Sequence, residues 1–140
     1  MAVTVTRYNH TEKLIRNGEV DFTNLKFLLR SVATVTATDT VVSELAGTQV
    51  SGNGWAVDGE ALANAAVTIV ATDGAMIDAT DIAVTATGGD IGPTLAGVIT
   101  DDTLADPIVL WHFDFGGSQT AGNGTEMQIN LNASGISRAT

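Results

Sequence analysis

The most apolar stretch of this chain is IVLWHFDF, residues 108–115. A run of about eight residues rich in branched and aromatic side chains is typical of a β-strand. A polar loop that ends at Asp106–Pro107 precedes it. The turn signal GNG, residues 122–124, follows it and leads into residues 127–131, where apolar and polar side chains alternate as in a half-buried strand. This part of the chain therefore predicts strands joined by turns.

Strand patterns continue on the N-terminal side of this stretch, separated by turn residues. Asn-Gly pairs at residues 17–18, 53–54 and 123–124 supply the positive φ angles that tight hairpins need. Residues 32–38, rich in Val and Thr, either extend the strand before them or cross to the next one. The other expected strands are residues 2–8, 22–30, 61–72, 82–87 and 95–100.

One segment has the spacing of a helix instead. Asp39 is a suitable N-cap and Gly47 is a natural stop. Between them, Val41, Val42 and Leu45 recur at helical intervals, so the sequence predicts a short helix over residues 40–46. Residues 76–81 are expected to be a short connection.

Together these patterns predict a mainly β protein, a single-domain β-sandwich or barrel of about seven to eight short antiparallel strands. It has one short helix near residues 40–46 and an extended N-terminal arm. The length agrees, because 140 residues make one domain of ordinary size. We expect residues 1–21 to be a relatively basic arm that contains the first strand, and residues 22–140 to be a strongly acidic, sandwich-like body.

Composition excludes several kinds of protein and of site. Apolar residues make up 44% of the chain, which allows a packed core and argues against wholesale disorder. The lack of cysteine excludes disulfides, thiolate zinc sites and cysteine nucleophiles. No stretch reaches the roughly 18–20 continuous apolar residues of a membrane span. Residues 1–7 also lack the basic-then-apolar layout of a secretory signal.

Charge is distributed unevenly along the chain, whose formal net charge is −10. Five of the six cations lie in residues 1–30, which net +2, whereas residues 31–137 carry thirteen acids and no cation. A body this acidic repels phosphates and anionic lipids, so we expect neither nucleic acid nor membrane as a partner. Two explanations remain open. One is a solvated acidic surface, and the other is a basic arm that contacts an acidic surface on a partner or neighbouring copy.

Candidate catalytic residues are few. His112 could be combined with an Asp and a serine, but no serine stands in the G-x-S-x-G context that exposes a nucleophile. A histidine between Trp111 and Phe113 on a strand is more typical of a hydrogen-bonded structural residue. The sequence therefore predicts no catalytic residue, no enzymatic activity and no cofactor.

Two groups of acids are candidate metal ligands. Asp101, Asp102 and Asp106 share an oxygen-rich loop, but their spacing does not match the calcium-loop motif. Asp78 and Asp81 form a second pair, which a turn explains as well. We predict no metal site and leave open whether the first loop binds a metal.

The stretch GGDIGP, residues 88–93, has some likeness to a phosphate-binding loop. It lacks the lysine of such loops, does not open a helical pattern, and carries Asp90 where an anion would bind. We expect a hinge or a sharp turn there.

The remaining informative side chains are candidates for protein contacts. Trp55 and Trp111 are expected to be anchors of either the core or an interface, and the sequence does not decide which. Basic side chains and an aromatic ring mark the N-terminal segment. The predicted interface residues are Arg7, Tyr8, Lys13, Arg16, Trp55 and Trp111.

Several short segments follow one another in a recognisable order. They are NLKFLL (24–29), QVSGNGW (49–55), GEAL (59–62), IDATD (77–81), LWHFDFG (110–116) and NASGI (132–136), with a short helix containing Leu45 after the first. In this order, over about residues 22–137, the chain resembles a group of small virion structural proteins of tailed bacteriophages. Residues 88–92 depart from the pattern and leave the local strand pairing open.

The resemblance implies a structural role in a phage particle. The role we favour is that of a decoration or cement protein, which binds the outer lattice of the major capsid protein and adds buried area across its seams. A tail or head–tail connector component is the alternative, and a non-viral acidic β-sandwich binding module is a second one. By analogy with threefold capsid sites we expect a homo-oligomer, first of all a trimer, located in the virion after assembly in the host cytoplasm.

Overall fold

Antiparallel β-sheet dominates this computed structural model, which describes residues 3–70, 74–131 and 137–139. Within these residues the strands form a six-stranded main sheet, a three-stranded sheet and a two-stranded ribbon. The predicted fold class, a mainly β, sandwich-like domain with a short helix, is confirmed.

The main sheet is built around its two longest strands. They pair along most of their length, and the apolar stretch 108–115 begins the longer one. The order across the sheet is β1 (Thr4–Arg7), β9 (Ile108–Ala121), β8 (Ile91–Asp101), β2 (Leu25–Arg30) and β3 (Gln49–Val50), with β4 (Glu60–Ala61) also paired to β2.

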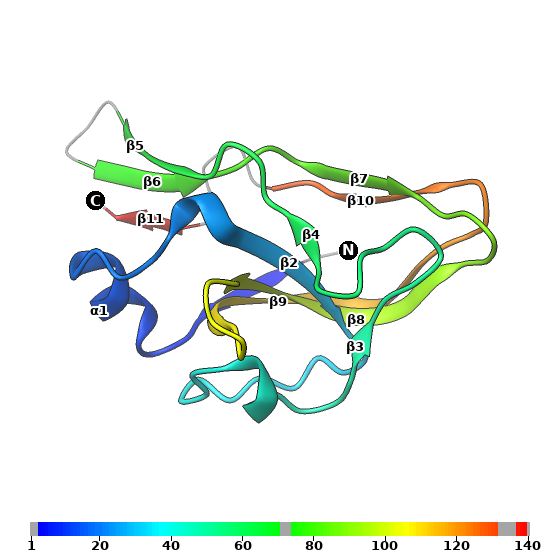
Figure 1. The fold of residues 1–140 in the computed structure, drawn as a ribbon, viewed down its shortest axis with the longest axis horizontal. Coiled ribbons are helices and arrows are strands. Elements are labelled where there is room, and N and C mark those ends of the chain that lie inside the picture. Colours follow the sequence, from blue (N-terminus) through cyan, green and yellow to red (C-terminus); the bar gives the residue numbers. More distant parts are fainter. Residues whose placement is uncertain (1–2, 71–73, 132–136, 140) are drawn as a thin grey trace.

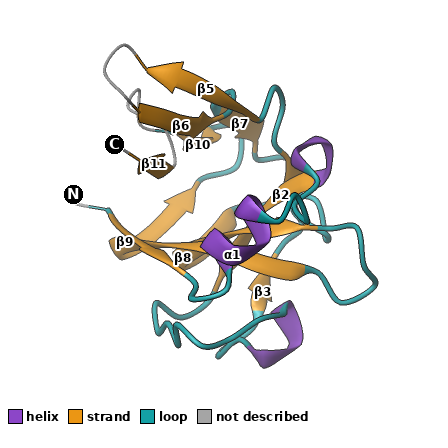
Figure 2. Ribbon diagram, turned by 90° about the vertical axis from the view of Figure 1, so that its left-hand side faces the viewer, coloured by secondary structure: helices purple, strands orange, loops and turns teal. Residues whose placement is uncertain are grey.

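The smaller sheets form a second layer, which lies over one face of the main sheet (Figure 1). Their strands are β11 (Ser137–Ala139), β6 (Gly74–Asp78) and β5 (Ala66–Val70) in one sheet, and β10 (Glu126–Ile129) and β7 (Ile82–Thr85) in the other. We call the main-sheet face beneath this layer the upper face. The opposite, lower face is covered by the irregular segment 31–47 (Figures 1 and 2).

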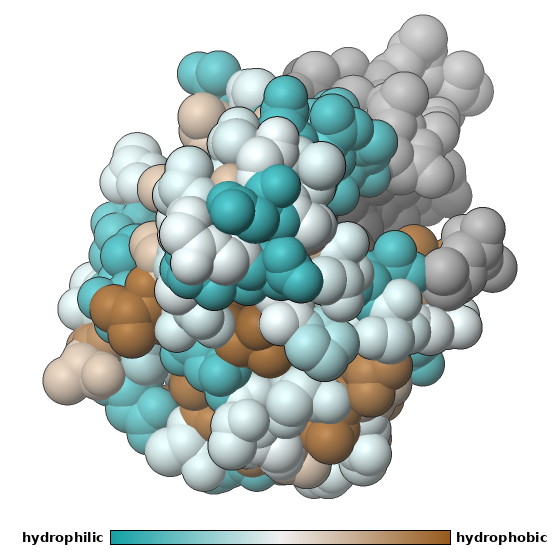
Figure 3. All heavy atoms as spheres, turned by 90° about the vertical axis from the view of Figure 1, so that its right-hand side faces the viewer, coloured by the Kyte–Doolittle hydropathy of each residue, from teal (hydrophilic) through white to brown (hydrophobic). Residues whose placement is uncertain are grey.

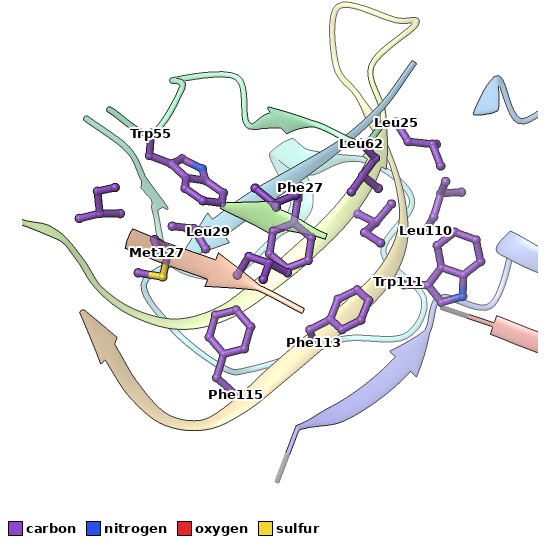
Figure 4. Close-up of a cluster of buried hydrophobic side chains, with 14 of the residues drawn as sticks. Leu25, Phe27, Leu29, Trp55, Leu62, Leu110, Trp111, Phe113, Phe115 and Met127 are labelled. Atoms are coloured by element: carbon purple, nitrogen blue, oxygen red, sulfur yellow. The ribbon is translucent and has the colours of Figure 1, made fainter. Parts of the chain in front are cut away.

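Alternation along the strands decides which side chains each face receives. The upper face carries Phe27, Trp111 and Phe113, which belong to a large buried apolar cluster (Figure 4). The rings of Phe27 and Phe113 lie with their centroids 5.4 Å apart and tilted by 44°. Gly97 lies opposite Phe113 on β8, where a Cβ would collide with the Phe27 ring, so only glycine allows that ring its place.

The lower face has a smaller apolar cluster made of Tyr8, Val98 and Val109. The segment 31–47 packs three side chains against it, from Val35, Val42 and Leu45. The lower face is thus covered by one irregular stretch of chain and not by a second sheet.

The helical elements differ in part from the prediction. A 3-10 turn, Val42–Glu44, falls inside the expected helix 40–46 but is shorter than it. The α-helix α1 (Thr11–Arg16) lies in the N-terminal segment instead, and a further 3-10 turn spans Phe22–Asn24. The buried Thr11 donates its hydroxyl to the carbonyl oxygen of Leu110 at 2.7 Å, which ties α1 to the main sheet.

The expected extended N-terminal arm is wrong as a description of residues 3–21. Residues 4–7 are a strand of the main sheet, and Leu14 and Ile15 of α1 pack against the large apolar cluster. The strand predicted within residues 2–8 is confirmed as β1. Burial of α1 against β9 is what turns the rest of the arm into part of the body.

Three strand predictions also change. Residues 61–72 are not one strand: Ala61 ends β4, and β5 follows after a gap at Ala66–Val70. Residues 71–72 lie outside the described part of the chain. The expected connection 76–81 contains most of strand β6. Residues 32–38 neither extend β2 nor form a strand; they belong to the segment over the lower face.

Candidate protein-binding surface

The basic side chains of residues 1–30 have two different fates in the fold. Lys26 forms an ion pair with Asp102 at 3.0 Å, and both side chains are about three-quarters buried. Arg30 is buried, and its guanidinium donates to the carbonyl oxygens of Ala46 and Gly47 at 3.1 and 3.2 Å. Burial lowers the pKa of Arg30 from its ordinary value. These two cations stabilise the fold and are not available to a partner.

The other three cations lie together on the surface at α1. Arg7 and Arg16 both bind the carboxylate of Glu12, at 2.7 and 2.8 Å, and Lys13 is exposed beside them. We call Arg7, Glu12, Lys13 and Arg16 the basic end of the molecule. Glu19, whose backbone N–H donates to the carbonyl oxygen of Leu14 in α1, places a second carboxylate beside these three cations. The local charge of this end is therefore +1, and exposed ion pairs of this kind add little stability. Its charge is therefore free to act on other molecules.

The surface away from α1 has the opposite character. Residues 31–137 carry thirteen acids and no Lys or Arg. The end of the molecule shown in Figure 3 presents hydrophobic side chains in small patches divided by hydrophilic ones. The chain is thus electrically polarised, with a small basic end on an acidic body.

Next to the basic end, β1 forms one edge of the main sheet in the described residues. The side chains of Val3 and Val5 are 53% and 46% exposed there. Figure 2 shows the N-terminal end at the rim of the sheet, beside β9. Two exposed valines and three exposed cations therefore lie at neighbouring positions of one surface.

The aromatic candidates for an interface are buried instead. Trp55 and Trp111 are 2% and 1% exposed and belong to the large apolar cluster (Figure 4). Tyr8 is fully buried in the smaller cluster, and this burial raises the pKa of its hydroxyl to about 12. The prediction of Tyr8 as an interface residue is wrong, because the segment 31–47 covers it. Of the six predicted residues, the structure brings Arg7, Lys13 and Arg16 together at the surface.

His112 lies on the lower face and has no catalytic surroundings in the described residues. It is 2% exposed, and neither ring nitrogen has a hydrogen-bond partner among those residues. Burial lowers its pKa, while the nearby carboxylate of Asp114 acts more weakly in the opposite direction. The sequence-based expectation of a hydrogen bond for this residue is wrong. A neutral imidazole sealed under a covering segment cannot reach a substrate as the chain is folded.

The acidic loops bind their own backbone. The buried carboxylate of Asp101 accepts hydrogen bonds from the backbone N–H groups of Asp21 and Thr103, at 2.9 and 3.1 Å. Asp106 accepts from the backbone N–H of Ser43 at 3.1 Å. In the described residues no group of three or more His, Asp or Glu side chains is arranged to bind a metal ion. The loop carboxylates act as turn and loop stabilisers.

The second acidic pair and the glycine-rich stretch have the same kind of role. The carboxylate of Asp81 accepts from the backbone N–H of Leu131 at 2.7 Å. Asp90 accepts from the Asn53 side chain through its carbonyl, and from the Asn123 N–H through its carboxylate, at 2.7 and 2.9 Å. Gly88 has a φ of +79°, which a sharp turn requires. The expected turn is present and joins three loops.

Comparison with known proteins adds no relative to this geometry. No protein-family model, no curated protein and no solved structure matches the chain. Among the residues that the structure describes, no helix has the length and apolar character that crossing a membrane requires. The residues NASGI (132–136), part of the phage resemblance, lie outside the described residues.

Proposed function

We propose that this chain is a structural subunit of a bacteriophage virion that decorates the capsid by binding the outer lattice of the major capsid protein. The observation that carries the proposal is the polarised surface, a basic end with exposed valines beside it on an acidic sandwich. A surface of this kind suits contact with an acidic protein surface, which steers association and fixes orientation. The resemblance over residues 22–137 is the reason for proposing a phage particle as the place where the chain acts.

The acidic body has a part in the same proposal. Once the basic end is bound, the outward surface of each bound copy carries net negative charge. Surfaces with a high charge of one sign repel one another, which keeps decorated particles from associating. The same charge disfavours nucleic acid as a partner.

The first experiment is the copy number of the chain in purified particles, by mass spectrometry against the major capsid protein. We expect about one copy per capsid subunit, or one per three, as a lattice-binding protein requires. A ratio of a few per hundred would move the protein to the tail or the connector. Absence from particles would refute a virion role and leave the acidic binding module.

A matched pair of variants tests the basic end directly. Lys13→Gln and Gln128→Glu each lower the net charge by one, and both positions are exposed. We expect Lys13→Gln to weaken binding to undecorated particles by roughly 3- to 10-fold, because it removes an exposed charge at the contact. Gln128→Glu, on β10, should bind like the unmodified chain. Equal binding by the two variants would contradict the assignment of the basic end.

A further inference from the structure

The backbone groups of β1 are divided between β9 and the open edge of the sheet. The N–H of Tyr8 donates to the carbonyl oxygen of Leu110 at 3.1 Å, across the β1–β9 ladder. In an antiparallel ladder every second residue points its backbone groups at the same neighbour. Thr6 and Thr4 therefore also direct their N–H and C=O groups toward β9, in register with His112 and Asp114.

The alternate residues, Val3, Val5 and Arg7, direct their backbone groups away from β9. Among the residues that the structure describes, nothing gives this strand the usual protections of a sheet edge: it contains no proline, its pairing with β9 is unbroken, and its only charged side chain is at its end. The sequence V-T-V-T is β-branched throughout, which favours the extended conformation that a further strand needs. The edge is therefore ready to pair.

We propose that β1 pairs with β1 of a second copy of this chain, antiparallel, with Val5 opposite the partner's Val5. In this register Val3 lies opposite the partner's Arg7, and Thr4 lies opposite the partner's Thr6. The outward backbone groups then match, since two such groups meet at Val5 and at each Val3–Arg7 pair. Roughly six hydrogen bonds form, two for each hydrogen-bonded pair.

The side chains match across this seam as well. Val3 and Val5 share the upper face of the sheet, so the two copies of Val5 meet there and cover apolar surface that is about half exposed in the single chain. The stem of Arg7 covers Val3 of the other copy. On the lower face, threonine meets threonine, a favourable cross-strand pair.

Charge favours this edge over the rest of the surface as the place where two copies meet. Residues 31–137 carry thirteen acids without a cation, so two copies repel at most of their surfaces. Between Val3 and Thr11 the one charged side chain is Arg7. The β1 edge is therefore the part of the surface where two copies repel each other least.

The contact is small, and this sets the concentrations at which it forms. About five residues a side is far fewer than the 20–30 of a stable interface. We therefore expect a dimer that becomes populated between about 10 µM and 1 mM, or where many copies share one surface. The dimer depends on the chain alone and not on the proposed virion role.

Two variants at one position separate the backbone from the side chain. Val5→Pro removes the outward N–H and keeps the bonds of Thr4 and Thr6 to β9, as proline does on an edge strand. Val5→Thr keeps that N–H and the β-branch. In sedimentation equilibrium from 10 µM to 1 mM, the unmodified chain and Val5→Thr should dimerise, whereas Val5→Pro should stay monomeric. A monomeric unmodified chain, a trimer, or a dimer of Val5→Pro would overturn the proposal.

Cysteine scanning tests the register without a proline. The chain has no cysteine, so each single variant carries one thiol. In hydrogen-bonded antiparallel pairs the Cα atoms are about 5.5 Å apart, within disulfide range. With oxidised glutathione as the oxidant, two Val5→Cys chains should lose their thiol protons and join in a disulfide-linked dimer, while glutathione is reduced. Thr4→Cys, opposite Thr6, should remain at least 5-fold less cross-linked. Equal cross-linking of the two variants would refute the register.

Discussion

The two faces of the main sheet are both buried, but different parts of the chain bury them. The upper face carries Phe27, Trp111 and Phe113 under a layer of paired strands. The lower face carries Arg30 and His112 under the irregular segment 31–47. Burial of large apolar side chains stabilises a fold, whereas burial of ionisable groups shifts their pKa values and makes stability depend on pH. The upper face therefore contributes most of the free energy of folding, and the lower face makes that free energy depend on pH.

One row of residues shows how polar groups came to be buried below. Leu28, Val98, His112 and Thr6 lie side by side across β2, β8, β9 and β1. The imidazole therefore lies between Val98 on one side and Thr6, a threonine on an edge strand, on the other. Only a covering segment excludes water from such a row, and that segment is 31–47. The lower face depends on that segment, whereas the upper face is covered mainly by paired strands, with Trp55 added from a turn.

The largest expected effect compares neighbours on β2 that point to opposite faces. Phe27→Ala should lower the free energy of unfolding by about 3–5 kcal/mol, because it leaves a ring-sized cavity in the large cluster. Leu28→Ala, buried on the lower face but in neither apolar cluster, should cost about 2 kcal/mol. Urea unfolding followed by tryptophan fluorescence measures both. Equal losses would show that the two faces contribute alike.

The second effect concerns the lower face at alkaline pH. Tyr8 has its pKa raised to about 12 by burial, with Asp39 acting in the same direction and Arg30 acting against it. Below pH 10 the hydroxyl is neutral in both the folded and the unfolded chain. Between pH 10 and 12 only the unfolded chain loses the proton, so stability falls as pH rises, by up to about 2–3 kcal/mol.

The measurement is direct, because Tyr8 is the sole tyrosine of the chain. Tyrosinate absorbance should titrate near pH 12 in the native protein and near 10 in denaturant. Tyr8→Phe should lose less stability than the unmodified chain between pH 10 and 12, while other groups titrate alike in both. Native titration near pH 10 would mean that the segment 31–47 does not seal the lower face.

Sequence patterns located most strands because an apolar run or an alternation is a local property. They placed β9, β7 and β10 within a few residues of their bounds at one end or both. The α-helix was missed, although Leu14 and Ile15 followed by Asn17–Gly18 give a short apolar face and a C-terminal stop. Six residues are too few for a periodicity to be distinguished from a turn.

The candidate site was only partly accessible to the same reasoning. The basic end could be predicted from the sequence, because Arg7, Lys13 and Arg16 lie within ten residues of one another along the chain. The burial of Tyr8 depends on Val35, Val42 and Leu45, about 27 to 37 residues further along the chain. No local pattern in residues 2–8 distinguishes a covered tyrosine from an exposed one. The sequence alone therefore does not predict that a distant segment covers this face of the sheet.

The smallest expected effect is that of His112 at acid pH. Burial lowers its pKa, and the groups around it on the lower face are Asp114, Arg30, Tyr8 and Thr6. Above the ordinary pKa of about 6.5 the imidazole is neutral in both states. As pH falls from there toward the folded pKa, the unfolded chain binds a proton that the folded chain does not, so stability is lost on acidification.

His112→Leu isolates this contribution. At pH 7 the variant should differ from the unmodified chain by less than about 1 kcal/mol, because the two side chains are similar in volume and the strain of their different shapes is offset by removal of polar atoms without partners. Between pH 7 and 5 the unmodified chain should lose more stability in urea than the variant. Groups other than His112 are the same in both chains and cancel in the difference. If the difference in unfolding free energy between the two chains stays constant with pH, the loss of stability in acid comes from groups other than His112. The lower face would then be as insensitive to acid as the upper face.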